Sequence, residues 1–125
     1  MKIIISECTD TKRYLLARKD FPRISRRVRR TLAAAKRGTS CAEMELRVEP
    51  GGEVAVAFDG CPIATLAHRP AEAWWRLINE MARRKVTLCA TVVMAEHTWW
   101  VELPSIEAAI ETINHTNVQI SYEDF

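Results

Sequence analysis

The sequence predicts one α+β domain over residues 1–125, built as a curved antiparallel sheet of five to seven strands that is open or partly closed into a small barrel. One Trp-rich helix is expected to pack on the sheet, with two further helices flanking it. Three observations lead to this prediction: an unbroken order of strand, turn, strand, helix, strand and strand over residues 53–104, further strand and helix patterns on both sides of it, and a hydrophobic fraction of 48%. A chain of this size and composition is sufficient for a single core.

The N-terminal part combines short strands with one basic helix. Residues 1–6 predict a strand, and three consecutive isoleucines favour a central position for it in the sheet. Residues 13–17 fit either a second strand or the start of a helix, because periodicity does not separate the two in so short a run. A helix is expected over residues 22–36, closed by Gly38. Residues 39–49 alternate between apolar and charged side chains, which predicts a half-buried strand beside the next hairpin.

A hairpin and a second helix follow. Residues 54–58 alternate as a strand, Asp59 and Gly60 supply a turn, and a second apolar run reaches Leu66. Pro70 fits the first turn of the next helix. The residues at helical spacing that are expected to face the sheet are Ala71, Trp74, Trp75, Ile78 and Ala82.

Two strands come after this helix. They cover residues 86–93 and 98–103, and Pro104 ends the second one. Side chains alternate along a strand, so Trp99 is expected to point inward. Trp100 is then expected to point outward, unless the C-terminal helix covers it.

The C-terminal part predicts a short helix and a last strand. Ser105 is a suitable N-cap for a helix with an apolar face, while Glu107 and Glu111 lie on the opposite face. Residues 118–122 alternate as a final strand. If this acidic helix packs against the basic one, the two charges cancel within the fold.

The central region resembles the second half of a HIRAN domain, a small β-rich module found on helicase-like remodelling proteins and as a stand-alone bacterial and phage protein. The resemblance covers residues 48–103, and its motif consists of an alternating strand, Asp59-Gly60, Ile63, Leu66 and the helix start at Ala71. This chain has Ala64 where members usually have Gly, and Thr65 where they have an aromatic residue or His that contacts DNA in the DNA-binding members. The resemblance therefore implies the fold rather than an inherited binding site.

Charge is divided unevenly along the chain. The formal net charge is only +2, yet residues 12–37 contain eleven Lys or Arg and one acid, whereas residues 96–125 contain six acids and neither Lys nor Arg. Such a division indicates charged partners rather than a particular fold.

The basic helix suggests what that partner is. Its apolar stripe is narrow, so most of its arginines face solvent or an anion, and few have an acid one turn away. A phosphate backbone matches the forked guanidinium groups, and an outward Trp beside them can stack on bases. We therefore predict a nucleic-acid-binding module for DNA or RNA. The predicted site residues are Arg23, Arg26, Arg27, Arg29, Arg30, Lys36, Arg37, His68, Arg69 and Trp100.

Three alternatives use the same residues differently. The arginines form a merely solvated surface, or they dock on an acidic protein surface. The second case describes a phage or mobile-element inhibitor, of the anti-defence or anti-CRISPR type, that binds a host protein complex. In the third, Trp100 and an apolar edge form a homodimer.

Enzymatic chemistry is not expected. The three histidines lie at turns or element ends without a motif-spaced nucleophile or ligand, and the chain has no phosphate-binding loop or metalloprotease motif. The cysteines Cys8, Cys41, Cys61 and Cys89 show no C-x-x-C spacing, so we expect buried reduced thiols, with no metal or cofactor. No run of 18 apolar residues is present, so a soluble cytoplasmic protein without membrane contact is expected.

Overall fold

The computed structural model of the chain describes residues 1–5, 11–18, 26, 29, 30, 33, 40–67, 72–95, 98–116 and 118. Within these residues the elements are β1 (Lys2–Ile4), β2 (Thr11–Arg18), β3 (Ser40–Val48), β4 (Val54–Phe58), β5 (Cys61–Leu66), α2 (Glu72–Arg83), β6 (Thr87–Met94), β7 (Trp99–Pro104) and α3 (Ile106–Asn114). Residues 13–17, which the sequence left open, belong to a strand.

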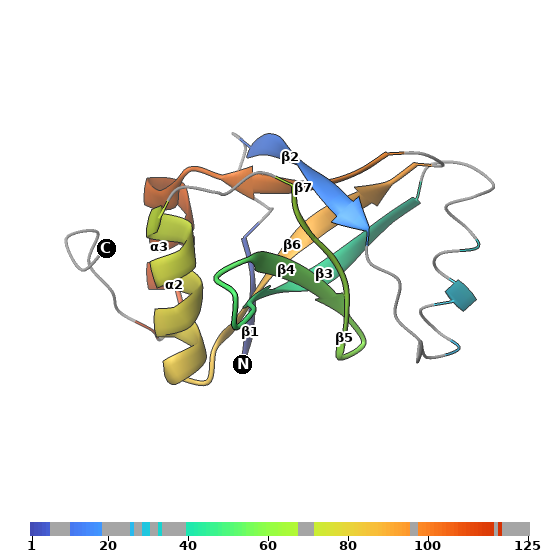
Figure 1. Cartoon of the computed structure of the whole chain (residues 1–125). Coiled ribbons are helices and arrows are strands. Elements are labelled where there is room, and N and C mark those ends of the chain that lie inside the picture. The colour runs from blue at the N-terminus through green and yellow to red at the C-terminus, as the bar shows by residue number, and fades with distance from the viewer. Residues whose placement is uncertain are drawn as a thin grey trace.

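Six of these strands form a closed antiparallel barrel (Figure 1). Their order is β6-β3-β4-β5-β2-β7, and β7 pairs back onto β6 to complete the circle. The sheet that the sequence predicts is thus a closed barrel, which removes the exposed edges of an open sheet. The structure describes only four residues of the basic helix predicted over residues 22–36, namely 26, 29, 30 and 33, and each is in helical conformation. The rest of that helix lies outside the described residues, so the predicted number of three helices is not confirmed.

The first strand lies at the edge of the sheet, so the central position predicted for it is wrong. β1 pairs in parallel with β6 from Lys2 beside Thr87 to Ile4 beside Cys89. The same edge of β6 pairs with β7 further along. Ile3 and Ile5 are buried even so, because β1 packs on the core from this edge position.

The Asp59–Gly60 turn confirms the predicted hairpin. Both residues have positive φ, 51° and 78°, which is the backbone of a type I′ turn. The β4–β5 register shifts between Val56 and Ala57, and this irregularity brings Pro62 opposite Ala57. A bulge tolerates a proline that a regular ladder would exclude.

One face of α2 packs into the core. Trp74, Leu77, Ile78 and Met81 are buried, following the i, i+3, i+4, i+7 spacing of an amphipathic helix. Trp75 is 39% exposed, so the prediction that both tryptophans face the sheet is wrong for Trp75. Neighbouring residues on a helix point about 100° apart, and the stripe that starts at Trp74 leaves Trp75 outside. Ala82 is exposed for the same reason.

The predicted acidic helix is confirmed as α3. The Ser105 side chain accepts a hydrogen bond from the Ala108 N–H, and Ile106, Ile110 and Ile113 are buried. Both α2 and α3 lie at the same end of the barrel (Figure 1). Of the last predicted strand only Val118 is described, and it packs against the core; the rest lies outside the described residues. No helix in the described part of the chain has both the length and the apolar character to span a bilayer.

The cysteines differ from one another in exposure. Cys89 is buried, Cys61 is half-buried and Cys41 is exposed, and no disulfide joins these three described cysteines. The expectation of buried thiols is therefore wrong for Cys41, because it stands on the outer side of β3. Cys8 lies outside the described residues.

Candidate nucleic-acid interface

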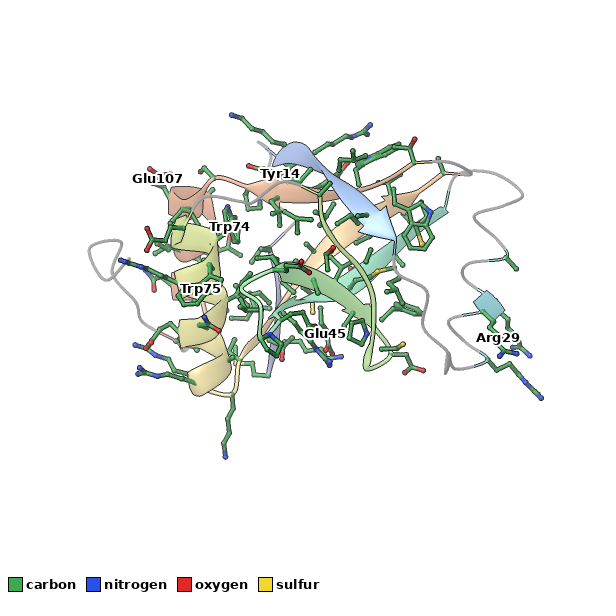
Figure 2. The ribbon with its side chains drawn as sticks, in the orientation of Figure 1. Tyr14, Arg29, Glu45, Trp74, Trp75 and Glu107 are labelled. Atoms are coloured by element: carbon green, nitrogen blue, oxygen red, sulfur yellow. The ribbon has the colours of Figure 1, made fainter. Side chains whose placement is uncertain are left out.

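Three of the predicted arginines can be located. Arg26, Arg29 and Arg30 are in helical conformation and exposed. Seen in Figure 2, Arg29 lies beyond one end of the barrel, and Glu107 of α3 lies at the other. The helical position and the exposure of these three residues agree with the sequence prediction.

The other basic residues of the predicted site lie outside the described residues: Arg23, Arg27, Lys36, Arg37, His68 and Arg69. Trp100 is therefore the remaining predicted site residue that the structure locates.

The ion pairs between described residues use other cations. On α2, Arg76 pairs with Glu72, and Arg83 and Arg84 both pair with Glu80. In the barrel wall, Glu45 pairs with Lys2 at 3.1 Å and with Arg47 at 3.0 Å, and Glu102 pairs with Arg13. Among the residues that the structure describes, Arg26, Arg29 and Arg30 have no ion pair.

The acidic C-terminal part does not reach these arginines where both are described. Glu102 is engaged by Arg13, with 3.4 Å between Nε and the carboxylate. Glu111 lies 4.0 Å from His115 within α3, and Glu107 is at the opposite end of the molecule from Arg29 (Figure 2). The internal neutralisation that the sequence left open is absent for Arg29 and these three carboxylates.

Arg13 is an exposed cation on the outer surface of β2 and β7. Leu15 stands opposite Trp100 and Arg13 opposite Glu102 in the β2–β7 register. The Arg13 guanidinium carbon lies 4.7 Å from the centroid of the Trp100 ring, a cation–π contact between diagonal neighbours on adjacent strands. Leu15 is 48% exposed beside this pair.

Trp100 is therefore not the open stacking surface that its outward position predicts. It is half-buried, the Arg13 guanidinium lies over its ring, and its Nε1 is buried without a hydrogen-bond partner in the described structure. The sequence suggests the C-terminal helix as a cover for Trp100, and it contains no signal that Arg13 covers the ring instead. Trp99 points inward and is 3% exposed, as predicted.

Trp75 is an exposed aromatic residue that the sequence interpretation assigned to the core. Its indole lies near the β3–β4 turn, where a Cβ added to Gly52 would be 4.0 Å from the Trp75 Nε1. The buried spacing of α2 could have identified it, because a stripe through Trp74, Leu77 and Met81 excludes position 75.

Two side chains in the barrel wall have shifted pKa values. Partial burial of Glu45 raises its pKa, but hydrogen bonds and charges from Lys2 and Arg47 outweigh that effect and hold the pKa below its usual value. Burial raises the pKa of the Cys89 thiol, which favours its unreactive protonated form. No group of three or more His, Cys, Asp or Glu side chains within the described ranges could hold a metal ion.

No protein-family model, curated protein or solved structure matches this chain. The HIRAN resemblance of residues 48–103 thus stays a prediction.

Proposed function

We propose that the protein is a small non-enzymatic module that binds nucleic acid through the phosphate backbone, with Arg26, Arg29 and Arg30 among the contacting residues. One observation carries the proposal: these guanidinium groups are exposed and have no carboxylate partner in the described structure. Exposed cations concentrated in this way repel one another, and a polyanion relieves that repulsion.

Phosphate contacts explain affinity without sequence preference. A guanidinium group donates paired hydrogen bonds to phosphate oxygens and releases condensed counterions from the nucleic acid. Such contacts position the protein but do not read bases. Arg13 is a secondary candidate for such a contact, because its side chain is 63% exposed although it pairs with Glu102.

A salt titration with matched variants tests the proposal. Fluorescence anisotropy would measure the affinity for labelled single-stranded DNA, duplex DNA and RNA between 50 and 300 mM salt. Replacing Arg29 and Arg30 with Gln should lower the slope of log K against log salt by about 2 and weaken binding at 0.1 M salt by roughly 50-fold.

The control removes the same charge elsewhere. Replacing Arg83 and Arg84 with Gln takes two exposed arginines from α2 and should leave the slope nearly unchanged, since both already pair with Glu80. If both double variants lost the same affinity, the effect would come from net charge alone and not from Arg29 and Arg30. Absence of binding to all three probes would refute the proposal.

A second experiment distinguishes a nucleic-acid partner from a protein partner. The tagged protein would be captured from bacterial lysate with and without nuclease treatment. Co-purifying nucleic acid that nuclease removes supports the proposal. A nuclease-resistant stoichiometric protein, lost with the Arg29 and Arg30 variant, would instead support an inhibitor that docks on a host complex.

A further inference from the structure

A pocket of about 570 Å³ opens where the barrel meets both helices. Its lining comes from the start of β2, the end of β7, the first turn of α2 and the first turn of α3. The residues that matter for its chemistry are Lys12, Tyr14, Trp74, Leu103, Ile106 and Glu107. This volume lies within the range of small-molecule sites in proteins, roughly 300–1,000 Å³. Figure 2 shows Tyr14, Trp74 and Glu107 near one another at this end of the molecule.

The walls of the pocket are aromatic and aliphatic. Tyr14 is half-buried and packs against the core, and Trp74 is 3% exposed. Leu103 and Ile106 are buried as well. Because these side chains belong to the core, the pocket is held in shape before any ligand enters, and a flat apolar group would lose little ordering entropy there.

Two opposite charges lie at the rim. Lys12 and Glu107 both line the pocket and are exposed, and neither takes part in an ion pair between described residues. An anion alone would be repelled by Glu107, and a cation alone by Lys12. The rim therefore favours a ligand that carries both charges.

The start of α3 adds hydrogen-bond donors on the same side. Ser105 occupies the cap position: its Oγ accepts from the Ala108 N–H at 3.2 Å, and its carbonyl accepts from the Ala109 N–H at 2.9 Å. The N–H groups of Ile106 and Glu107, at the start of the helix, donate no hydrogen bond to another described residue. Such groups bind a carboxylate, and Lys12, which lines the same pocket, supplies a positive charge for it.

From these features we infer that the pocket binds a free α-amino acid with an aromatic side chain. The ring packs against Tyr14 on the apolar floor of the pocket, the α-carboxylate is bound by Lys12 and the N–H groups at the start of α3, and the α-ammonium is bound by Glu107. This site is at the opposite end of the barrel from Arg29, so the inference does not depend on nucleic-acid binding.

Solution NMR of the ¹⁵N-labelled protein tests the inference directly, with L-tryptophan as the probe. The amide signals of Ile106 and Glu107 should shift with a dissociation constant of about 0.5 mM, the affinity that an average ligand efficiency gives for a compound of this size. Tryptamine lacks the carboxylate and indole-3-propionate lacks the ammonium, so each should bind at least about fivefold more weakly. L-Leucine retains both charges but lacks the ring and should also bind weakly.

Conservative variants identify the two charges. Lys12→Gln and Glu107→Gln should each weaken L-tryptophan binding about five- to tenfold, with otherwise unchanged spectra that show an intact fold. Glu111→Gln is the matched control, because Glu111 is exposed one turn further along α3 and does not line the pocket. Two results would overturn the inference: no shift of the Ile106 and Glu107 amides at about 10 mM L-tryptophan, twentyfold above the expected constant, or equal affinity for indole-3-propionate and L-tryptophan.

Discussion

Two arginine-bearing segments of this protein differ in what surrounds each charge. On α2, Arg76 lies 2.8 Å from Glu72, and Arg83 and Arg84 lie 3.4 and 3.1 Å from Glu80. Arg26, Arg29 and Arg30 are also exposed, but the chain has no Asp or Glu from residue 21 to residue 42. A helix brings together residues three and four positions apart, so local acids neutralise the first segment and not the second. The two segments thus differ in unpaired charge rather than in the number of their arginines, and it is this difference on which the proposed binding surface rests.

Charge reversal at Arg29 and Arg30 should have the largest effect on nucleic-acid binding. Arg29→Glu combined with Arg30→Glu should weaken nucleic-acid binding by about 100-fold or more at 0.1 M salt, since two phosphate contacts are lost and repulsion is added. Arg83→Glu with Arg84→Glu changes net charge equally and should cost only a few fold. Anisotropy at one salt concentration measures both. If the α2 variant lost as much, the difference between the segments would have no functional meaning.

A paired carboxylate in the barrel wall provides the next test. Glu45→Gln should lower the free energy of unfolding at pH 7 by about 1–2 kcal/mol, because Lys2 and Arg47 lose a charged hydrogen-bond partner. The pKa of Glu45 is lower in the folded protein than its unfolded value of 4.5, so its contribution is present above pH 4.5 and is lost as pH falls through the folded pKa. Urea unfolding at pH 7 and at about pH 3 should therefore show a smaller acid-induced loss in the variant than in the wild type. An identical pH dependence would contradict this assignment.

Removing the acids from α2 should make it resemble the other segment. Glu72→Gln together with Glu80→Gln removes the carboxylates that pair with Arg76, Arg83 and Arg84. Affinity for duplex DNA should then rise about three- to tenfold at 0.1 M salt, with a steeper salt dependence. Glu107→Gln with Glu111→Gln, which changes net charge by the same amount on α3, should have a smaller effect. Equal gains from the two variants would show that net charge alone matters.

The smallest effect is expected at the C-terminal end of α2. Lys85 has φ of 59°, and the Val86 N–H bonds to the Met81 carbonyl, an arrangement in which glycine is preferred. Lys85→Gly should raise the free energy of unfolding by about 0.5–1 kcal/mol. It should change nucleic-acid affinity less than twofold if the α2 end takes no part in binding. Thermal unfolding measures the stability, and anisotropy measures the affinity. A lower stability of the variant would show that the positive φ of Lys85 costs no free energy.

Local patterns predicted much of this fold because they depend on neighbouring residues. The Asp59–Gly60 turn, the alternation of β3 and the Ser105 cap are properties of a few consecutive positions, and all three are found in the structure. The expected core position of Trp75 is wrong because the buried stripe of α2 passes through Trp74, Leu77 and Met81, and Trp75 lies about 100° around the helix from Trp74. The edge position of β1 could not be read from its isoleucines, since partner choice depends on residues far along the chain.

The candidate sites depend more strongly on distant contacts. Arg13 lies over Trp100 because β2 pairs with β7 in one register, and a shift by one residue would separate them. The pocket combines β2, β7, α2 and α3, so no single stretch of sequence indicates it. Exposed arginines without nearby acids were visible in the sequence, because that property is local.

The pairing of β1 with β6 also has a consequence for synthesis on the ribosome. The strand at residues 2–4 is synthesised before its partner at residues 87–89, which follows it by more than 80 residues. At a synthesis rate of about 5–20 residues per second, several seconds pass before the partner strand of these isoleucines has been made. During that interval these isoleucines lack the strand that pairs with them in the folded protein.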